Sequence, residues 1–353
     1  MLSSAANTTL CQVGAGKSRH LLKIAVSLVL AVVLFAYFLH RAPLREVSQT
    51  LIHVRLGWFL ASLAVALLTY LVRALRWALI LRPVGHARTA QIIGCTAAGF
   101  ATSAVLPARA GELVRPLLLS SLSGLPPAGT LASILTERLL DGAAMLLLFI
   151  AGVTFAPTGV ASGSLGTLHH AALLTALGLI AAVVFVEFLL RRRDATVGTL
   201  VRLLPARFRE RGARFFHHLL DGLEVLRSPV RLLEITSWSL ALWLLIGFQL
   251  VLLARAFDFP LNLGHAFIVV TLSVVGLAVP TPAGVGGFHA MIQFALTHFL
   301  GVSATTATAF ALLHHAICFF PITVLGLAYL GAVGFSLDRV TKLRETGPPG
   351  GTG

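Results

Sequence analysis

The chain has 353 residues, of which 57% are hydrophobic and only 11% are charged, and its mean hydropathy is +0.90. Soluble domains contain about 25% charged residues, so this composition excludes an ordinary soluble protein. One bilayer crossing takes about 20 mostly apolar residues, and this length allows several. We therefore predict an all-α, polytopic membrane protein.

The net charge of +14 comes from arginine and lysine residues that flank the apolar segments. Such residues are typical of cytoplasmic loops and are attracted to anionic lipid, so we expect no nucleic-acid partner. The cysteines Cys11, Cys95 and Cys318 are far apart. This spacing favours packing roles, and we expect no metal or other cofactor.

The apolar segments predict six full crossings. They lie at about 21–39, 57–81, 130–155, 168–190, 232–254 and 305–333. Residues 1–19 form a polar, cytoplasmic tail, and the crossing that follows is long enough to be a start-transfer helix rather than an excised signal. Residues 41–55 are expected to be a mixed loop, and residues 336–353 a disordered tail.

Two further apolar stretches, residues 90–122 and 264–300, are interrupted by proline and glycine. Pro107 disfavours a continuous helix through the first, because proline removes a backbone donor and clashes with the preceding turn. The second is interrupted between Val279 and Gly287. Each stretch is predicted to be a re-entrant hairpin of two short helices, since non-helical backbone at membrane depth needs protein or a wet cavity around it.

The order of crossing, crossing, hairpin and crossing occurs twice, in opposite orientations. The first copy is residues 20–156, and the second comprises 157–190, with an outer loop, and 232–335. This order predicts an inverted repeat, which is typical of transporters whose site lies where broken helices meet. Placing both termini in the cytoplasm puts the strongly basic segments inside, so we expect a multi-pass inner-membrane protein.

The two copies are separated by an arginine-rich segment, residues 191–231. Its apolar residues recur at helical spacing: Leu203, Phe208, Phe215, Leu219, Leu223 and Leu226. We predict a basic amphipathic helix that lies on the anionic cytoplasmic leaflet.

Arg109, Glu112 and Arg115 share one side of the short helix that begins after Pro107. A helix N-terminus with two guanidinium groups is suited to an anion, and phosphate fits best. Glu112 either holds an arginine or accepts a proton, and the alternative for the group is a structural ion pair near the membrane rim. Because a charge at membrane depth costs about 2.5–3.5 kcal/mol, three together favour a functional role.

A second charged cluster lies in the predicted crossing 130–155. Its members are Glu137, Arg138 and Asp141. They either orient the first cluster or contact the substrate. Arg73 and Arg76 lie near one end of the preceding crossing and either snorkel to the headgroups or complete a basic vestibule.

The second interruption supplies the remaining candidate substrate-binding residues. They are Pro280, Pro282, Gly284, Gly287 and His289. The prolines and glycines permit a tight break with backbone N–H groups toward a cavity, or serve only close helix packing. His289 is expected to titrate or to donate to a ligand.

Three motifs, at residues 106–112, 137–141 and 279–287, together resemble the lysylphosphatidylglycerol synthase transmembrane family, also called flippase-like domain proteins. The resemblance covers about residues 20–335 and implies a polytopic membrane protein; in the fused synthases of this family, the domain is associated with moving an aminoacylated phospholipid to the outer leaflet. It also implies site residues at Arg109, Gly111, Glu112, Arg115, Glu137, Arg138, Pro280, Pro282 and Gly284. Two departures are the lack of an aminoacyl-transferase domain after the last crossing and His289, where many relatives have a glutamate.

The leading hypothesis is a translocase for an anionic or phosphate-bearing lipid rather than an enzyme. Residues 14–18 resemble the end of a P-loop but lack its first glycine and the preceding strand, so ATP hydrolysis is not expected. The alternatives are an enzyme that acts on a polyprenyl-phosphate substrate, with Glu112, Glu137 and Asp141 as acid, base or metal ligands, and a non-catalytic membrane partner. The sequence is compatible with a homo-oligomer.

Overall fold

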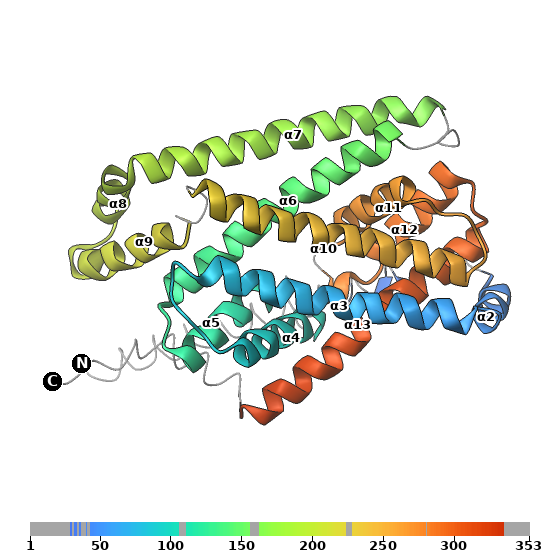
Figure 1. Cartoon of the computed structure of the whole chain (residues 1–353), viewed down its shortest axis with the longest axis horizontal. Helices are drawn as coiled ribbons and strands as arrows, with labels where there is room; N and C mark the ends of the chain where they lie inside the picture. The colour runs from blue at the N-terminus through green and yellow to red at the C-terminus, as the bar shows by residue number, and fades with distance from the viewer. Residues whose placement is uncertain are drawn as a thin grey trace, which may run out of the picture.

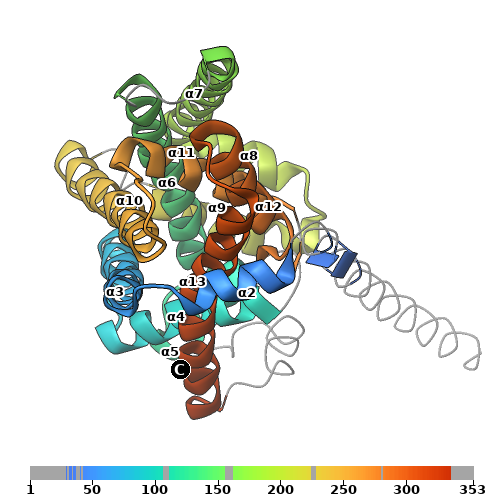
Figure 2. The same cartoon turned by 90° about the vertical axis from the view of Figure 1, so that its right-hand side faces the viewer.

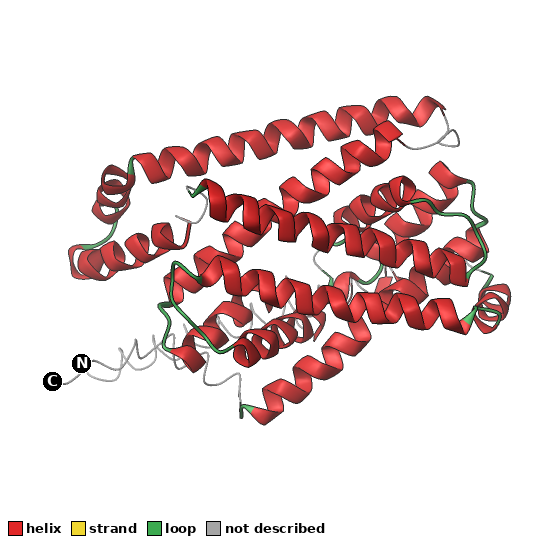
Figure 3. Cartoon of the chain, in the orientation of Figure 1, coloured by secondary structure: helices red, strands yellow, loops and turns green. Residues whose placement is uncertain are grey.

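The computed structural model describes residues 29, 32–33, 35–36, 40, 43–105, 111–155, 162–223, 228–279 and 281–334. Every element in these ranges is a helix, which confirms the predicted all-α class (Figure 3). Three helices are long and apolar enough to cross a membrane: α3 (Leu56–Leu81), α10 (Pro229–Ala256) and α13 (Ala304–Ala332). They correspond to three of the six predicted crossings.

Two more predicted crossings lie within long helices. These are α6 (Pro127–Phe155), with 29 residues, and α7 (Ser162–Arg191), with 30 residues. At 1.5 Å per residue each exceeds 40 Å, which is longer than the hydrocarbon core of about 30 Å. The remaining crossing, 21–39, lies mostly outside the described residues, and the predicted tails 1–19 and 336–353 lie wholly outside them.

The expected loop at 41–55 is wrong, because residues Leu44–Ile52 form helix α2. The Val47 N–H donates to the Pro43 carbonyl oxygen at 2.9 Å, so the helix starts directly after the proline. The side chain of Val47 is buried beside Ala309 of α13. A short amphipathic helix is thus stabilised by packing that the local sequence does not show.

Both interrupted stretches consist of short helices. The first contains α4 (Thr89–Val105) and α5 (Gly111–Ser123), while Pro107 itself lies outside the described residues. The second contains α11 (Leu263–Gly276), the 3₁₀ turn η3 (Pro282–Gly284), α12 (Gly287–Phe294) and the π-helical turn η4 (Ala295–Phe299). The prediction of two short helices in each stretch therefore agrees with the structure.

The segment 191–231 is not one amphipathic helix, although its helix α9 is basic and amphipathic. The described part contains α8 (Arg193–Arg202), the 3₁₀ turn η1 (Ala206–Phe208) and α9 (Arg209–Leu223). Pro205 precedes the turn, where a proline cannot continue the hydrogen-bond ladder of α8. Leu223 is buried in a cluster with residues of α6 and α7, whereas Leu203 is 79% exposed, so the apolar residues face two different ways.

The helices form an elongated bundle with α3 and α10 side by side along its length (Figure 1). Helix α13 packs along α4, and α6 packs against α11 and α9. Helix α7 lies at one edge of the bundle, while α8 and α9 lie at the end opposite α2. Figure 2 shows α2 crossing beside α13 at that other end.

Candidate functional site

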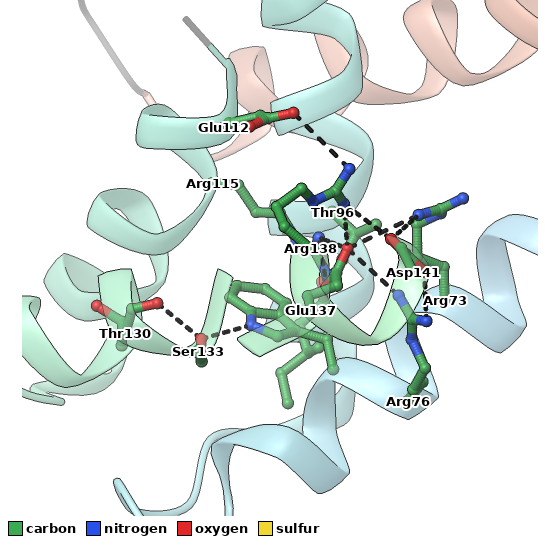
Figure 4. A network of polar contacts seen from close by, with 12 residues as sticks. Arg73, Arg76, Thr96, Glu112, Arg115, Thr130, Ser133, Glu137, Arg138 and Asp141 are labelled. Carbon is green, nitrogen blue, oxygen red and sulfur yellow. Dashed lines mark hydrogen bonds and ion pairs between the residues drawn. The ribbon is translucent and has the colours of Figure 1, made fainter. Parts of the chain in front are cut away.

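Seven charged side chains from three helices meet in one polar network (Figure 4). Helix α3 supplies Arg73 and Arg76, α5 supplies Glu112 and Arg115, and α6 supplies Glu137, Arg138 and Asp141. The spacing of the α6 residues, with Asp141 one helical turn after Glu137, turns both carboxylates toward α3.

Glu137 lies at the centre of the network and has no exposed side-chain surface. Its carboxylate accepts hydrogen bonds from Arg115 Nη1 at 3.0 and 3.1 Å and from Arg138 Nη2 at 2.7 Å. The arginines of α3 add longer ion pairs, at 3.7 Å from Arg73 and 3.6 Å from Arg76. One carboxylate thus binds together three helices.

Asp141 connects the network to α10. Arg76 Nη1 donates to Asp141 Oδ1 at 2.6 Å, and Trp243 Nε1 donates to the same oxygen at 3.1 Å. Arg76 Nη1 also donates to Ser239 Oγ at 2.9 Å. The side chain of Arg76 is completely buried, so the alternative in which it snorkels to the headgroups is wrong.

Arg115 is held against an aromatic ring as well as against Glu137. Its guanidinium carbon lies 3.9 Å from the centroid of the Trp77 ring, a cation–π distance. The indole N–H of Trp77 donates to Ser133 Oγ at 2.9 Å, which fixes the ring. Arg115 Nε and Nη2 are buried and have no hydrogen-bond acceptor among the described residues.

The accessible edge of the network consists of Arg73, Arg138 and Glu112. Their side chains are 12%, 38% and 38% exposed, respectively. Arg138 Nη1 and Glu112 Oε1 are 3.8 Å apart, beyond hydrogen-bond distance, whereas Arg138 Nη2 is tightly held by Glu137. An incoming group would therefore meet two guanidinium groups whose positions are fixed from behind by buried carboxylates.

The described network has four guanidinium groups and three carboxylates, so it has an excess of one positive charge. The four most buried members, Arg76, Arg115, Glu137 and Asp141, balance one another, so the excess lies at the accessible edge. Ionisable groups inside a membrane domain are typical of substrate or ion sites. An anion is the ligand that would neutralise this excess.

A family model described as the lysylphosphatidylglycerol synthase TM region matches residues 21–326. The chain belongs to this family. No curated protein matched the chain. Membership agrees with the apolar helices and makes the chain a membrane protein of a lipid-related family.

The family motifs divide between the network and the second interruption. Of the site residues that the resemblance implies around the first two motifs, the structure brings together Glu112, Arg115, Glu137 and Arg138, whereas Arg109 lies outside the described residues. Gly111 lies at the crossing of α4 and α5, where a Cβ atom would be 1.8 Å from the Gly99 carbonyl oxygen. This glycine allows α5 to bring Arg115 close to α4.

The residues of the second interruption form a separate cluster. Pro280 lies outside the described residues, and Pro282 and Gly284 belong to the turn η3, where Gly284 has a φ of +68°. A Cβ atom on Gly287 would be 2.4 Å from the Gly276 carbonyl oxygen, so this glycine serves close packing of α11 and α12.

His289 is buried and faces aromatic and imidazole rings rather than the charged network. Its Nδ1 accepts from the Gly286 N–H at 3.4 Å, and its ring centroid is 4.5 Å from that of His315. His315 Nε2 lies 3.1 Å from the Ala283 carbonyl oxygen. Each of the two histidines thus contacts a backbone atom of the interruption.

Three residues that hold the network are absent from the sequence predictions: Trp77, Ser239 and Trp243. Trp77 follows Arg76 directly, and an indole beside an arginine pair is the only local signal for its role. Ser239 and Trp243 lie 163 and 102 residues from their partners, so no local pattern indicates them.

Proposed function

We propose that this protein is a lipid translocase that moves an anionic or phosphate-bearing lipid between the leaflets of the inner membrane. The observation that supports it best is the network of four guanidinium groups against three carboxylates in a membrane domain of this family. Arg73 and Arg138 would bind the headgroup phosphate, since guanidinium groups offer planar, bidentate donors. Arg76, Arg115, Glu137 and Asp141 would position them.

We further propose the inverted repeat, with two re-entrant hairpins formed by α4–α5 and α11–α12. Contacts between helices support a pseudo-two-fold relation. Helix α3 of the first repeat packs on α10, its counterpart in the second. Helix α4 packs on α13, and their counterparts α11 and α6 pack on each other in the same way. Under this relation each hairpin packs against the last helix of the other repeat, which is the arrangement expected of inverted-repeat transporters.

Close glycine contacts follow the same relation. Within the hairpins, a Cβ on Gly111 would meet the Gly99 carbonyl oxygen and one on Gly287 would meet the Gly276 carbonyl oxygen. Between repeats, a Cβ on Gly152 of α6 would lie 2.7 Å from the Gly264 carbonyl oxygen of α11. One on Gly326 of α13 would lie 2.1 Å from the Ala97 carbonyl oxygen of α4. These four close approaches, two in each proposed repeat, support a similar backbone arrangement in the two repeats.

The carboxylates give less support to an enzyme. Glu137 and Asp141 are each surrounded by arginines, which hold both as charged acceptors and leave neither as a metal ligand or a general acid. Among the described residues, no group of three His, Cys, Asp or Glu residues is arranged to hold a metal ion. Lipid movement needs only that the headgroup is bound and released.

The test is a lipid-movement assay in proteoliposomes with Arg138→Gln. Loss of a charge-assisted hydrogen bond costs about 1.5–3 kcal/mol, which predicts a roughly 10- to 150-fold slower exchange of labelled phosphatidylglycerol. Arg82→Gln is the matched control, because Arg82 is exposed and its ion pair with Glu234 is long, at 3.6 Å. Wild-type protein that moves none of a panel of anionic lipids, or an Arg138→Gln rate equal to that of the control, would exclude the proposal.

A further inference from the structure

A second pair of arginines lies at the other end of α3 and α10. Arg55 immediately precedes α3, and Arg255 lies in the last turn of α10. The Arg55 backbone N–H donates to the Ala256 carbonyl oxygen at 2.9 Å, which fixes the two helix ends against each other. Trp58, on the first turn of α3, lines the same hollow as both side chains.

These residues line a cavity of about 440 Å³. Its walls are Arg55, Trp58, Arg255, Asp258, Phe259 and Pro260. A larger cavity of about 740 Å³ adjoins it and shares Arg55 and Asp258. Both are open hollows at the protein surface, and neither is lined by a residue of the buried network.

The two arginines of this end are in different electrostatic situations. Arg55 Nη2 donates to Asp258 Oδ2 at 2.7 Å, so its charge is compensated. The guanidinium carbon of Arg255 lies 5.0 Å from the centroid of the Trp58 ring, and none of the described carboxylates pairs with Arg255. A guanidinium on an indole face keeps its planar edge of N–H donors directed outward, which suits an oxyanion.

The two arginine sites are separated along α3 by most of the thickness of a membrane. Trp58 and Arg73 are 15 residues apart on α3, and Arg55 and Arg76 are 21 apart. At 1.5 Å per residue these separations are about 22 and 32 Å along the helix axis. The hydrocarbon core is about 30 Å thick, and tryptophan is typical of its two boundaries.

We propose that Arg255, with Trp58 and Arg55, forms a second oxyanion site, which binds the phosphate of a lipid headgroup at the membrane face opposite the buried network. This inference rests on the proposed function in so far as the second site would receive or supply the transported lipid. The same helix pair, α3 and α10, would then present one phosphate site at each face. Asp258 would neutralise Arg55, and Arg255 would bind the phosphate.

The experiment measures binding rather than movement, so that the two proposals fail separately. Full-length protein in detergent is titrated with phosphatidylglycerol, and native mass spectrometry counts the bound lipids. Wild type is expected to hold two tightly, and Arg255→Gln and Arg138→Gln one each. The control Arg82→Gln should hold two, and diacylglycerol, which has no phosphate, should bind at neither site.

Further variants separate binding from folding. Arg255→Lys keeps the charge but loses the planar fork, and it should weaken the second lipid roughly tenfold, less than the glutamine does. Unchanged elution on size exclusion and an unchanged first lipid show that the variant is folded. If Arg255→Gln binds two lipids as tightly as wild type, the second site does not exist.

A competition arm identifies the source of the phosphate. Glycerol phosphate that displaces the Arg255-dependent lipid shows that the anion alone is recognised, whereas lipid retained against it shows that the chains are needed; both results support the site. If instead Arg138→Gln keeps two lipids while Arg255→Gln loses one, the second site stands and the headgroup role of the buried network fails.

Discussion

Replacing Glu137 by glutamine tests the buried network most directly. The substitution keeps the shape of the side chain but removes the charge that faces Arg115 and Arg138 at 3.1 Å or less. The four arginines would then be balanced by Asp141 and the partly exposed Glu112 alone. The positive excess of the whole network would rise from one to two, and the buried part would no longer be balanced.

The size of the effect follows from the distances. Two unit charges about 3 Å apart attract by roughly 5–6 kcal/mol at an effective dielectric constant of about 20. Glutamine retains some hydrogen bonding, and breaking a buried ion pair by removing one partner typically costs about 3–5 kcal/mol. We expect a loss of about 3–5 kcal/mol in the free energy of unfolding of Glu137→Gln.

Equilibrium unfolding in mixed detergent micelles, followed by circular dichroism, measures this loss. The matched variant is Glu112→Gln, because this carboxylate is 38% exposed and lies 3.8 Å from Arg138. Exposed ion pairs are worth about 0–1 kcal/mol, so its effect should be small. Equal unfolding free energies for Glu137→Gln and Glu112→Gln would refute the reasoning, since burial would then not decide the cost.

Gly287→Ala should lower the free energy of unfolding by about 1–3 kcal/mol, the range for overpacking, because the added Cβ would lie 2.4 Å from the Gly276 carbonyl oxygen. Gly178→Ala, which meets nothing within 4 Å, is its control in the same unfolding assay, and equal stabilities would argue against the close approach. A nitroxide on Leu203→Cys should collide more with lipid-soluble oxygen than with a water-soluble nickel complex in anionic vesicles, since Leu203 is 79% exposed within the arginine-rich segment. The opposite ratio would place this segment in water, and a label at Leu223→Cys, a buried position, should meet neither reagent.

The broken stretches could be predicted from the sequence because their signal is local. Proline and glycine divide each apolar stretch into two halves, and each half is too short to cross the membrane. The structure has short helices in both places. Helix α2 was missed because its nine residues depend on burial of Val47 beside α13, which lies more than 250 residues away. Tertiary packing, not the local pattern, determines that element.

The charged residues of the network could be predicted, whereas their arrangement could not. Charged residues within apolar segments are easily recognised in the sequence. Glu112 and Arg115, the described members of the cluster after Pro107, both lie in the network. The sequence predicts Glu112 and Arg115 on one side of a short helix, but Glu112 is partly exposed whereas Arg115 is 5% exposed and stacked on Trp77. Which arginine is buried depends on the angle between α5 and α3, and no spacing rule determines that angle.

The two interrupted stretches differ in chemistry. The first brings Arg115 to the carboxylates of α6, while the second brings His289 to the ring of His315 on α13. Under the proposed repeat, the counterpart of the buried ion network is thus a cluster of imidazole and aromatic rings with no carboxylate among its described members. Under the proposed function, a phosphate would therefore meet guanidinium groups at the first hairpin and imidazole rings at the second.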